Sequence, residues 1–268
     1  MTRATVITNW IENVGRGTVR GLEELGYVAA LLFESLYWLV RGRSRKQPVR
    51  MPSLFHEAMQ IGVKAIPICA VLSFSIGVML AIQGIESLKT FGAEAQVILG
   101  IALSISREFS PLIIGILIAG RSGSAIAARL GTMHESQEID ALRVMGVNPI
   151  RYLASPILIA LIIMMPMLTI LGNVMGMLGG AVYTNIELNI SYTTYADRTL
   201  EILSIYDIMQ GIIKSIVFAI IIALVGLSNG FQVNGGAEGV GRATTRAVVL
   251  SITYIVIADM IFTYFLNR

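Results

Sequence analysis

Five long apolar stretches constrain what this chain can fold into. They cover about residues 61–84, 97–119, 153–180, 207–228 and 247–266. Each is close to or above the roughly 20 residues that an α-helix needs to cross the hydrocarbon core of a bilayer. Backbone N–H and C=O groups find no water inside lipid, so a spanning segment of this kind must be helical. We therefore expect an all-α integral membrane protein with about five transmembrane helices.

The composition agrees with this class and disfavours others. Of 268 residues, 55% are hydrophobic and 14% are charged, against about 25% charged in a typical soluble domain. Cys69 is the only cysteine, so the sequence provides neither a disulfide framework nor a thiolate metal site. His56 and His134 are the only histidines and lie far apart in the sequence, so a metal site or a histidine-based catalytic site is poorly supported.

The first fifty residues form a separate region ahead of the membrane domain, which we place at residues 51–268. The region begins amphipathic, becomes apolar up to Val40 and ends in the basic loop RGRSRKQPVR. This pattern is typical of a helix that lies along the membrane interface. The alternative is a sixth span from Gly26 to Val40. We favour the interfacial helix because those fifteen residues are short for a crossing and include Glu34.

The distribution of lysine and arginine predicts the orientation in the membrane. Residues 1–60 contain eight of these residues, the loop after the second span contains four and the loop after the fourth contains two. The loops and terminus on the other side contain only Lys89, Arg198 and Arg268. Positive residues accumulate on the cytoplasmic side, so the N-terminus is expected in the cytoplasm and the C-terminus outside it. The net charge of +3 reflects this bias, and no nucleic-acid partner is expected.

The loop between the second and third spans contains a stretch that resembles a soluble helix, TMHESQEIDALRVMGVNP. Thr132 and Glu135 match a capping box, Gly146 suits the left-handed position after a helix, and Pro149 prevents continuation. We expect one helix at about residues 133–145.

The predicted helix has an apolar stripe formed by Ile139, Leu142 and Met145. Such a stripe needs a cover. The cover is either the membrane and the protein's own bundle, or a soluble partner that docks there.

Charged residues also occur inside the predicted spans. Arg107 and Glu108 lie near the middle of the second span, where a charge costs at least about 2.5 to 3.5 kcal/mol. Adjacent helical positions point about 100° apart, so at least one of the two is expected to face something else. Lys214 and Asp259 lie at equal depth in the last two spans, which favours a structural ion pair over a transport role.

No nucleotide-binding loop of the Walker A type is present, because none of the four lysines follows a glycine. ATP hydrolysis by this chain alone is therefore not expected. A secondary transporter or channel that moves ions through the charged residues is the alternative class, although no inverted repeat with paired broken helices is recognisable.

Several motifs in order resemble the MlaE-type permeases, the membrane subunits of lipid-moving ABC transporters. They are GRSGSAIAARLGTMHESQEIDALRVMGVNP, REFSP at 107–111, IKSIVFA at 213–219, SNGF at 228–231 and GVGRATTRAVV at 239–249. The resemblance implies a permease that is not itself an enzyme and that sits as a homodimer in a bacterial inner membrane, with its C-terminus periplasmic. It implies an ATPase subunit that holds ATP and Mg²⁺, leaving this chain without a cofactor. A periplasmic MCE-domain protein is implied as a further partner, and the family pattern allows for a small cytoplasmic regulatory subunit.

The resemblance also implies roles for individual residues. The loop helix becomes the coupling helix that docks on the ATPase, formed by Glu138, Ile139, Asp140, Leu142, Arg143, Met145 and Gly146. Arg107 and Glu108 are placed beside a lipid cavity. Leu80, Gln83 and Leu88 form a stripe near the outer end of the first span, and spacing alone favours lipid-facing or helix-packing residues there. By resemblance they line the same cavity at the dimer interface.

Overall fold

The computed structural model describes residues 19, 22–23, 26–38, 41 and 51–266, and every regular element in this part of the chain is helical. Five helical passages are long and apolar enough to cross a membrane: Met51–Lys89, Glu94–Glu135, Ile150–Leu188, Ile205–Phe231 and Gly236–Leu266. This confirms the predicted all-α membrane architecture. Each passage extends beyond the apolar stretch that predicted it.

Three of the passages are composite. The first contains α2 (Met51–Ile61), η1 (Val63–Ala65) and α3 (Ile66–Lys89). The second contains η2 (Glu94–Gln96), α4 (Val97–Ser104), η3 (Ile105–Phe109), α5 (Ser110–Ile118), η4 (Ala119–Gly123) and α6 (Ser124–Glu135). After α7 (Glu138–Val144), the third contains η5 (Ile150–Ala154) and α8 (Ser155–Leu188). The remaining helices are α9 (Tyr192–Ile202), α10 (Ile205–Phe231) and α11 (Gly236–Leu266).

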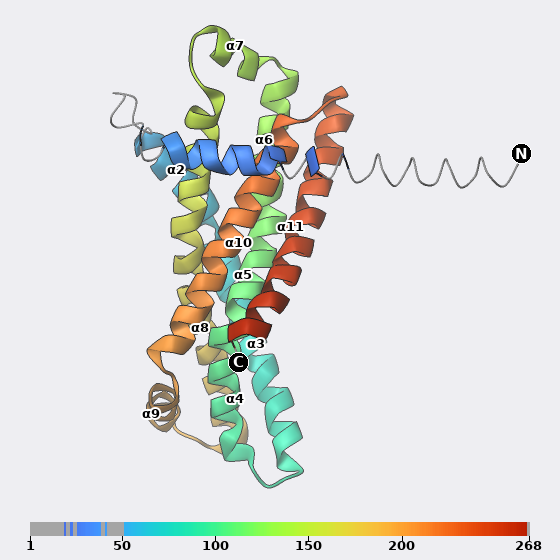
Figure 1. Cartoon of the computed structure of the whole chain (residues 1–268). Helices are drawn as coiled ribbons and strands as arrows, with labels where there is room; N and C mark the ends of the chain where they lie inside the picture. Colours follow the sequence, from blue (N-terminus) through green and yellow to red (C-terminus); the bar gives the residue numbers. More distant parts are fainter. Residues whose placement is uncertain (1–18, 20–21, 24–25, 39–40, 42–50, 267–268) are drawn as a thin grey trace, which may run out of the picture.

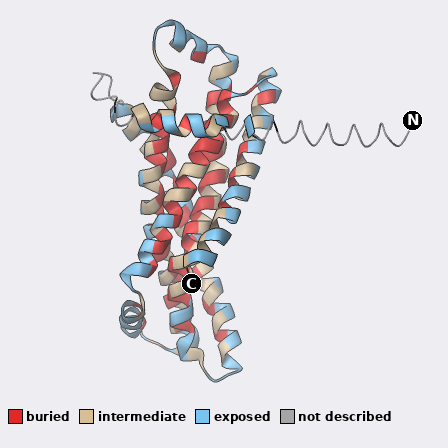
Figure 2. Cartoon of the chain, in the orientation of Figure 1, coloured by how far each residue is buried: buried red, intermediate tan, exposed pale blue. Residues whose placement is uncertain are grey.

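The passages form an elongated bundle whose two ends differ (Figure 1). We call them the α7 end and the α9 end, after the short helices found there. At the α9 end, the hairpin of α3 and α4 continues past the C-terminal end of α11 (Figure 1). Buried residues line the interior of the bundle, and exposed residues occupy its outer faces and both ends (Figure 2).

Among the described residues, the two largest of three buried apolar clusters hold the bundle together. The larger one joins the middle of the long helices and includes Phe218 and Leu161, both without exposed surface. The second lies at the α9 end, where Ile98 and Ile101 of α4 pack with Tyr195 of α9. Because Tyr195 is buried in this core, it anchors helix α9 to the bundle. The same burial raises the pKa of the Tyr195 hydroxyl to about 12.

Helices α3 and α8 approach each other closely because glycines face each other at their crossing. A Cβ added at Gly77 would lie 1.8 Å from the carbonyl oxygen of Gly176, and one added at Gly179 would lie 2.1 Å from that of Phe74. Small residues let membrane helices approach at backbone distance. This crossing fixes the first passage against the third.

Two of the π-helical turns, η3 and η5, end at a Ser-Pro pair. The N–H of Ser110 bonds to the carbonyl of Ile105, and that of Ser155 bonds to the carbonyl of Ile150, each five residues back. The following prolines, Pro111 and Pro156, have no N–H to continue the α-helical pattern. The sequence thus introduces a local widening of the helix at both positions.

Residues 26–38 form a helix that lies across the bundle near the α7 end (Figure 1). Leu31 is buried in the larger core, Ser35 is also buried, and the carboxylate of Glu34 accepts a hydrogen bond from Asn148 Nδ2 at 2.8 Å. The crosswise orientation agrees with an interfacial helix and disfavours a sixth span. The rest of the predicted N-terminal region, including the basic loop, lies outside the described residues apart from residues 19, 22–23 and Arg41.

Candidate functional site

A cluster of charged side chains joins η3 to α10 and α11 toward the α9 end. Arg107 contacts Asp207, the third residue of α10: its Nε donates to Oδ1 at 2.7 Å and its Nη2 lies 2.5 Å from the same oxygen. Asp207 is buried, and its other oxygen accepts hydrogen bonds from the backbone N–H and hydroxyl of Ser204. A single carboxylate therefore caps α10 and orients the guanidinium of Arg107.

Glu108, the next residue, has a different partner. The ammonium of Lys214, which has no exposed surface, donates to Glu108 Oε2 and lies 3.0 Å from Asp259 Oδ1. Thr263 connects the same groups, because its hydroxyl accepts from Lys214 at 3.0 Å and donates to Glu108 at 2.9 Å. The structure thus contains the expected Lys214–Asp259 contact. It adds Glu108 as a second carboxylate on the same lysine.

The local backbone explains how neighbouring residues reach separate partners. Arg107 and Glu108 lie in the π-helical turn η3, and Asp207, Gln210 and Lys214 follow one face of α10 toward it. A Cβ added at Gly211 would lie 2.3 Å from the carbonyl oxygen of Ser106. Glycine at this position therefore lets α10 approach η3 closely enough for direct ion pairs.

The charge balance of the cluster indicates what it can do. Arg107 and Lys214 face three carboxylates, those of Glu108, Asp207 and Asp259. The side chains of Arg107 and Glu108 remain 33% and 29% exposed, whereas Asp207 and Lys214 are buried. The buried partners fix the geometry, and the two partly exposed residues can contact a ligand.

One amide of the cluster has no partner inside the described part of the chain. Gln210 is buried between Asp207 and Lys214 on α10, and neither its oxygen nor its nitrogen makes a hydrogen bond there. The second carboxylate oxygen of Glu108, Oε1, is buried and likewise without a hydrogen-bond partner among the described residues. Buried polar groups are normally satisfied, so these atoms are where a bound polar group or water would be accommodated.

The other predicted cavity residues lie on a different helix. Leu80 and Leu88 of α3 pack against the second core, and Gln83 is exposed. The charge cluster is built from η3, α10 and α11. Within one copy of the chain, the predicted set therefore separates into a charged group and an α3 group.

The loop helix differs from the prediction at its start. Helix α6 continues from the second passage to Glu135, so Thr132 lies inside it and its hydroxyl donates to the Ala128 carbonyl at 3.0 Å. The chain turns at Gln137, whose φ is 60°, and α7 begins at Glu138. The capping-box prediction is therefore wrong, because the packed helix α6 runs through the predicted cap.

The end of α7 follows the expected pattern. Gly146 has a φ of +74°, and its N–H bonds to the Arg143 carbonyl at 3.0 Å. The N–H of Val147 bonds to the Leu142 carbonyl at 2.9 Å. These two bonds form a Schellman motif, which terminates α7 and directs the chain back to the bundle.

The apolar stripe of α7 is divided between core and surface. Ile139 is fully buried in the protein's own core, so its assignment to a docking surface is wrong. Leu142 is half-buried, whereas Met145 is 68% exposed. Val144, which the stripe did not include, is 88% exposed. The other predicted docking residues, Glu138, Asp140, Arg143 and Gly146, are exposed around these two side chains.

Comparison with known proteins identifies the family of this chain. The model of the family described as Permease MlaE matches residues 54–265. The chain belongs to the MlaE permease family. A probable ABC transporter permease protein of Rickettsia typhi is 33% identical over 98% of this chain and 100% of its own length.

Two further relatives have more specific names. The intermembrane phospholipid transport system permease protein MlaE of Haemophilus influenzae is 31% identical over 96% of this chain and 97% of its own. The chloroplastic protein trigalactosyldiacylglycerol 1 of Arabidopsis thaliana is 37% identical over 83% of this chain and 64% of its own length.

The MlaE permease match includes both candidate functional regions of this chain. It covers α7 and all the residues of the charge cluster, but it begins after the helix at residues 26–38. Sequence reasoning missed Asp207 and Val144. The S-x-x-D pattern from Ser204 to Asp207 signals a capping box and could have identified Asp207 as a fixed carboxylate.

Proposed function

We propose that this chain is the membrane permease subunit of an ABC transporter that moves phospholipid or a related lipid. The lipid would pass between a bacterial inner membrane and a periplasmic MCE-domain protein, and a separate subunit would hydrolyse ATP. The observation that carries the proposal is the MlaE family match across nearly the whole membrane domain. The phospholipid transport named for the Haemophilus relative supports the choice of substrate class.

In this proposal the α7 end faces the cytoplasm, as the excess of lysine and arginine at that end indicates. The exposed side chains of Val144 and Met145 provide an apolar contact for the ATPase. The Schellman motif and the buried Ile139 hold α7 in place beneath them. A short helix anchored in this way can transmit a movement of the ATPase to the bundle, with two copies of the chain forming the homodimer.

The charge cluster is then the lipid-facing element. Arg107 is a partly exposed cation whose orientation is set by the buried Asp207, so it can bind a phosphate oxygen while retaining its internal partner. Glu108 is held by Lys214 and Thr263, and it forms the adjacent wall. Leu80, Gln83 and Leu88 would join this site only through the second copy.

The test is gentle purification of the chain from its native membrane, followed by identification of co-purifying subunits and bound lipids. We expect an ATPase subunit, an MCE-domain protein and phospholipid. We also expect no ATP hydrolysis by the verified single chain in liposomes, because it has no Walker A sequence. Hydrolysis by the single chain, or transport that follows an ion gradient without ATP, would contradict the proposal.

A further inference from the structure

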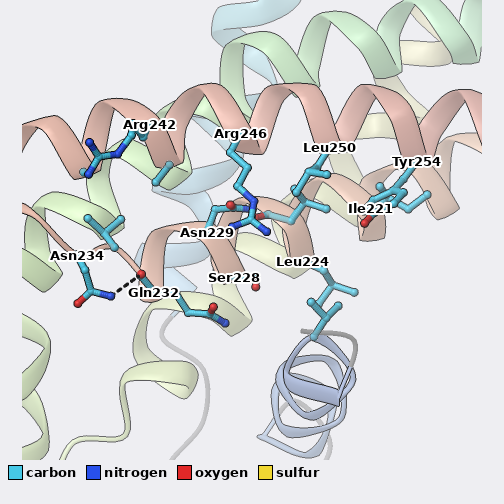
Figure 3. A pocket seen from close by; sticks show the side chains of 15 residues that line it. Ile221, Leu224, Ser228, Asn229, Gln232, Asn234, Arg242, Arg246, Leu250 and Tyr254 are labelled. Atoms are coloured by element: carbon cyan, nitrogen blue, oxygen red, sulfur yellow. Dashed lines mark hydrogen bonds between the residues drawn. The ribbon is translucent and has the colours of Figure 1, made fainter. Parts of the chain in front are cut away.

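A groove between α10 and α11 at the α7 end is separate from the charge cluster. It has a volume of about 840 Å³ and is lined by residues of α10, α11 and the loop between them, with Val28 of the crosswise helix at its edge. Figure 3 shows its side chains. Lys214 lies toward the opposite end of α10 and Arg107 lies in η3, and neither residue lines the groove.

The groove is polar at one end and apolar at the other. On α11, Arg242, Arg246, Leu250 and Tyr254 recur every fourth residue, and a rise of 1.5 Å per residue places the first and last about 18 Å apart. The facing wall follows the same order. Its polar members are Ser228, Asn229 and Gln232 near the α7 end, and its apolar members deeper in the bundle are Ile221, Leu224 and Val225.

The charge of the groove is positive. Among the described residues, fifteen line the groove, and none of these is acidic. Arg242 forms an ion pair with Glu238, four residues before it on the same helix, and both side chains are exposed. The Arg246 side chain extends from α11 toward Asn229 on the facing wall (Figure 3). A guanidinium therefore lies at the entrance to an apolar channel.

The cationic entrance followed by apolar walls matches the order of groups in a phospholipid, in which a phosphate headgroup is followed by acyl chains. Basic residues between transmembrane helices at the membrane surface bind the headgroups of anionic lipids. A free phosphate ion would use the arginines but would leave the apolar walls around Ile221 and Tyr254 without a ligand. The 18 Å length of the α11 stripe matches a chain that starts at the interface and continues into hydrocarbon.

We propose that this groove binds one anionic phospholipid from the leaflet at the α7 end. Its phosphate contacts Arg246 and Arg242, and one acyl chain lies along Leu250 and Tyr254. The proposal requires only that the helices cross a bilayer. It does not depend on which lipid is transported or on the role of Arg107.

Native mass spectrometry of the delipidated full-length chain tests the proposal, with phosphatidylglycerol, phosphatidylcholine and inorganic phosphate as separate probes. We expect phosphatidylglycerol to bind more tightly than phosphatidylcholine. The double substitution Arg242→Gln with Arg246→Gln should weaken phosphatidylglycerol binding by roughly tenfold to thirtyfold, as the loss of two interfacial cations predicts. A matched double substitution at the other end, Lys89→Gln with Arg198→Gln, should leave it unchanged.

A second variant tests the apolar half without changing the charge. Leu250→Trp should fill the apolar half of the groove and reduce phosphatidylglycerol occupancy, while Leu200→Trp, at a 75% exposed position on α9, should leave this occupancy in place. Equal binding of the two lipids, equal effects of the two double substitutions, or displacement of lipid by inorganic phosphate alone would overturn the proposal. Loss of dimer without loss of lipid in the arginine variant would assign the groove to a second copy and would also overturn it.

Discussion

Arg107 and Glu108 are adjacent in the chain, yet they bind opposite charges on two different turns of α10. Arg107 pairs with Asp207 in the first turn, and Glu108 pairs with Lys214 two turns further on. The π-helical turn and the close approach at Gly211 make this possible. The result is a pair of partly exposed charges, each held by a buried partner.

Replacing Lys214 with Met should destabilise the protein strongly. The lysine is fully buried, and its removal leaves Glu108 and Asp259 without their shared cation. Breaking a buried ion pair costs about 3 to 5 kcal/mol. Thermal unfolding in detergent measures the loss. Lys64→Met is the control, because Lys64 is exposed and its ammonium donates to Gln60 Oε1 at 2.7 Å, four residues earlier. Equal unfolding temperatures for the two variants would show that the cluster is not structural.

Asp207→Asn should impair transport while preserving the fold. The asparagine oxygen can still accept from Ser204 and cap α10, but Arg107 loses its charged partner. We expect lipid transfer in proteoliposomes to fall roughly tenfold, the equivalent of one charge-assisted hydrogen bond. Asp197→Asn on the exposed face of α9 should have no effect. A wild-type rate in Asp207→Asn would remove Arg107 from the site.

The double substitution Val144→Asp with Met145→Asp should release the ATPase. These two side chains are the exposed apolar surface of α7, and burying two carboxylates in an apolar contact should weaken co-purification at least tenfold. Leu200→Asp is the control, because Leu200 is 75% exposed at the other end of the bundle. If the double variant retains as much ATPase as the control, α7 is not the docking element.

Two glycine-to-alanine substitutions should have different effects on the stability of the protein. Gly77→Ala places a Cβ against the backbone of α8, so the helices must separate, at a cost of about 1 to 3 kcal/mol. Gly100→Ala, within α4, meets no atom within 4 Å and should be neutral or should stabilise the helix. Thermal unfolding of both variants in the same detergent tests the crossing. A stabilising Gly77→Ala would contradict the close packing of α3 and α8.

The fold was largely predictable because apolar length is a local property. The five spans follow from it, and the left-handed Gly146 follows from the preference of glycine for that conformation. The prediction that Thr132 caps the loop helix was wrong, because α6 packs in the bundle and continues past Thr132 to Glu135 despite the capping sequence there. The partner of Arg107 could not be predicted, since Asp207 is one hundred residues away and contacts of this range depend on how the helices cross.

Helical periodicity alone also could not predict which side chains of the loop helix α7 are buried. Ile139 and Met145 satisfy the same helical spacing, but one faces the core and the other faces outward. Which of these two side chains is buried depends on the turn at Gln137, because this turn sets the direction of α7. Tertiary structure therefore decided which part of the stripe remains available to a partner.

The most direct test of the central claim is lipid transfer in proteoliposomes that contain all subunits, measured with and without ATP and with and without a pH gradient. We expect lipid transfer to require ATP and to proceed at the same rate with and without the pH gradient. Glu108→Gln should lower the rate only partially, because the amide can still accept from Lys214 and Thr263. Transfer that follows the pH gradient, ignores ATP and disappears completely in Glu108→Gln would contradict the account and favour an ion-driven transporter.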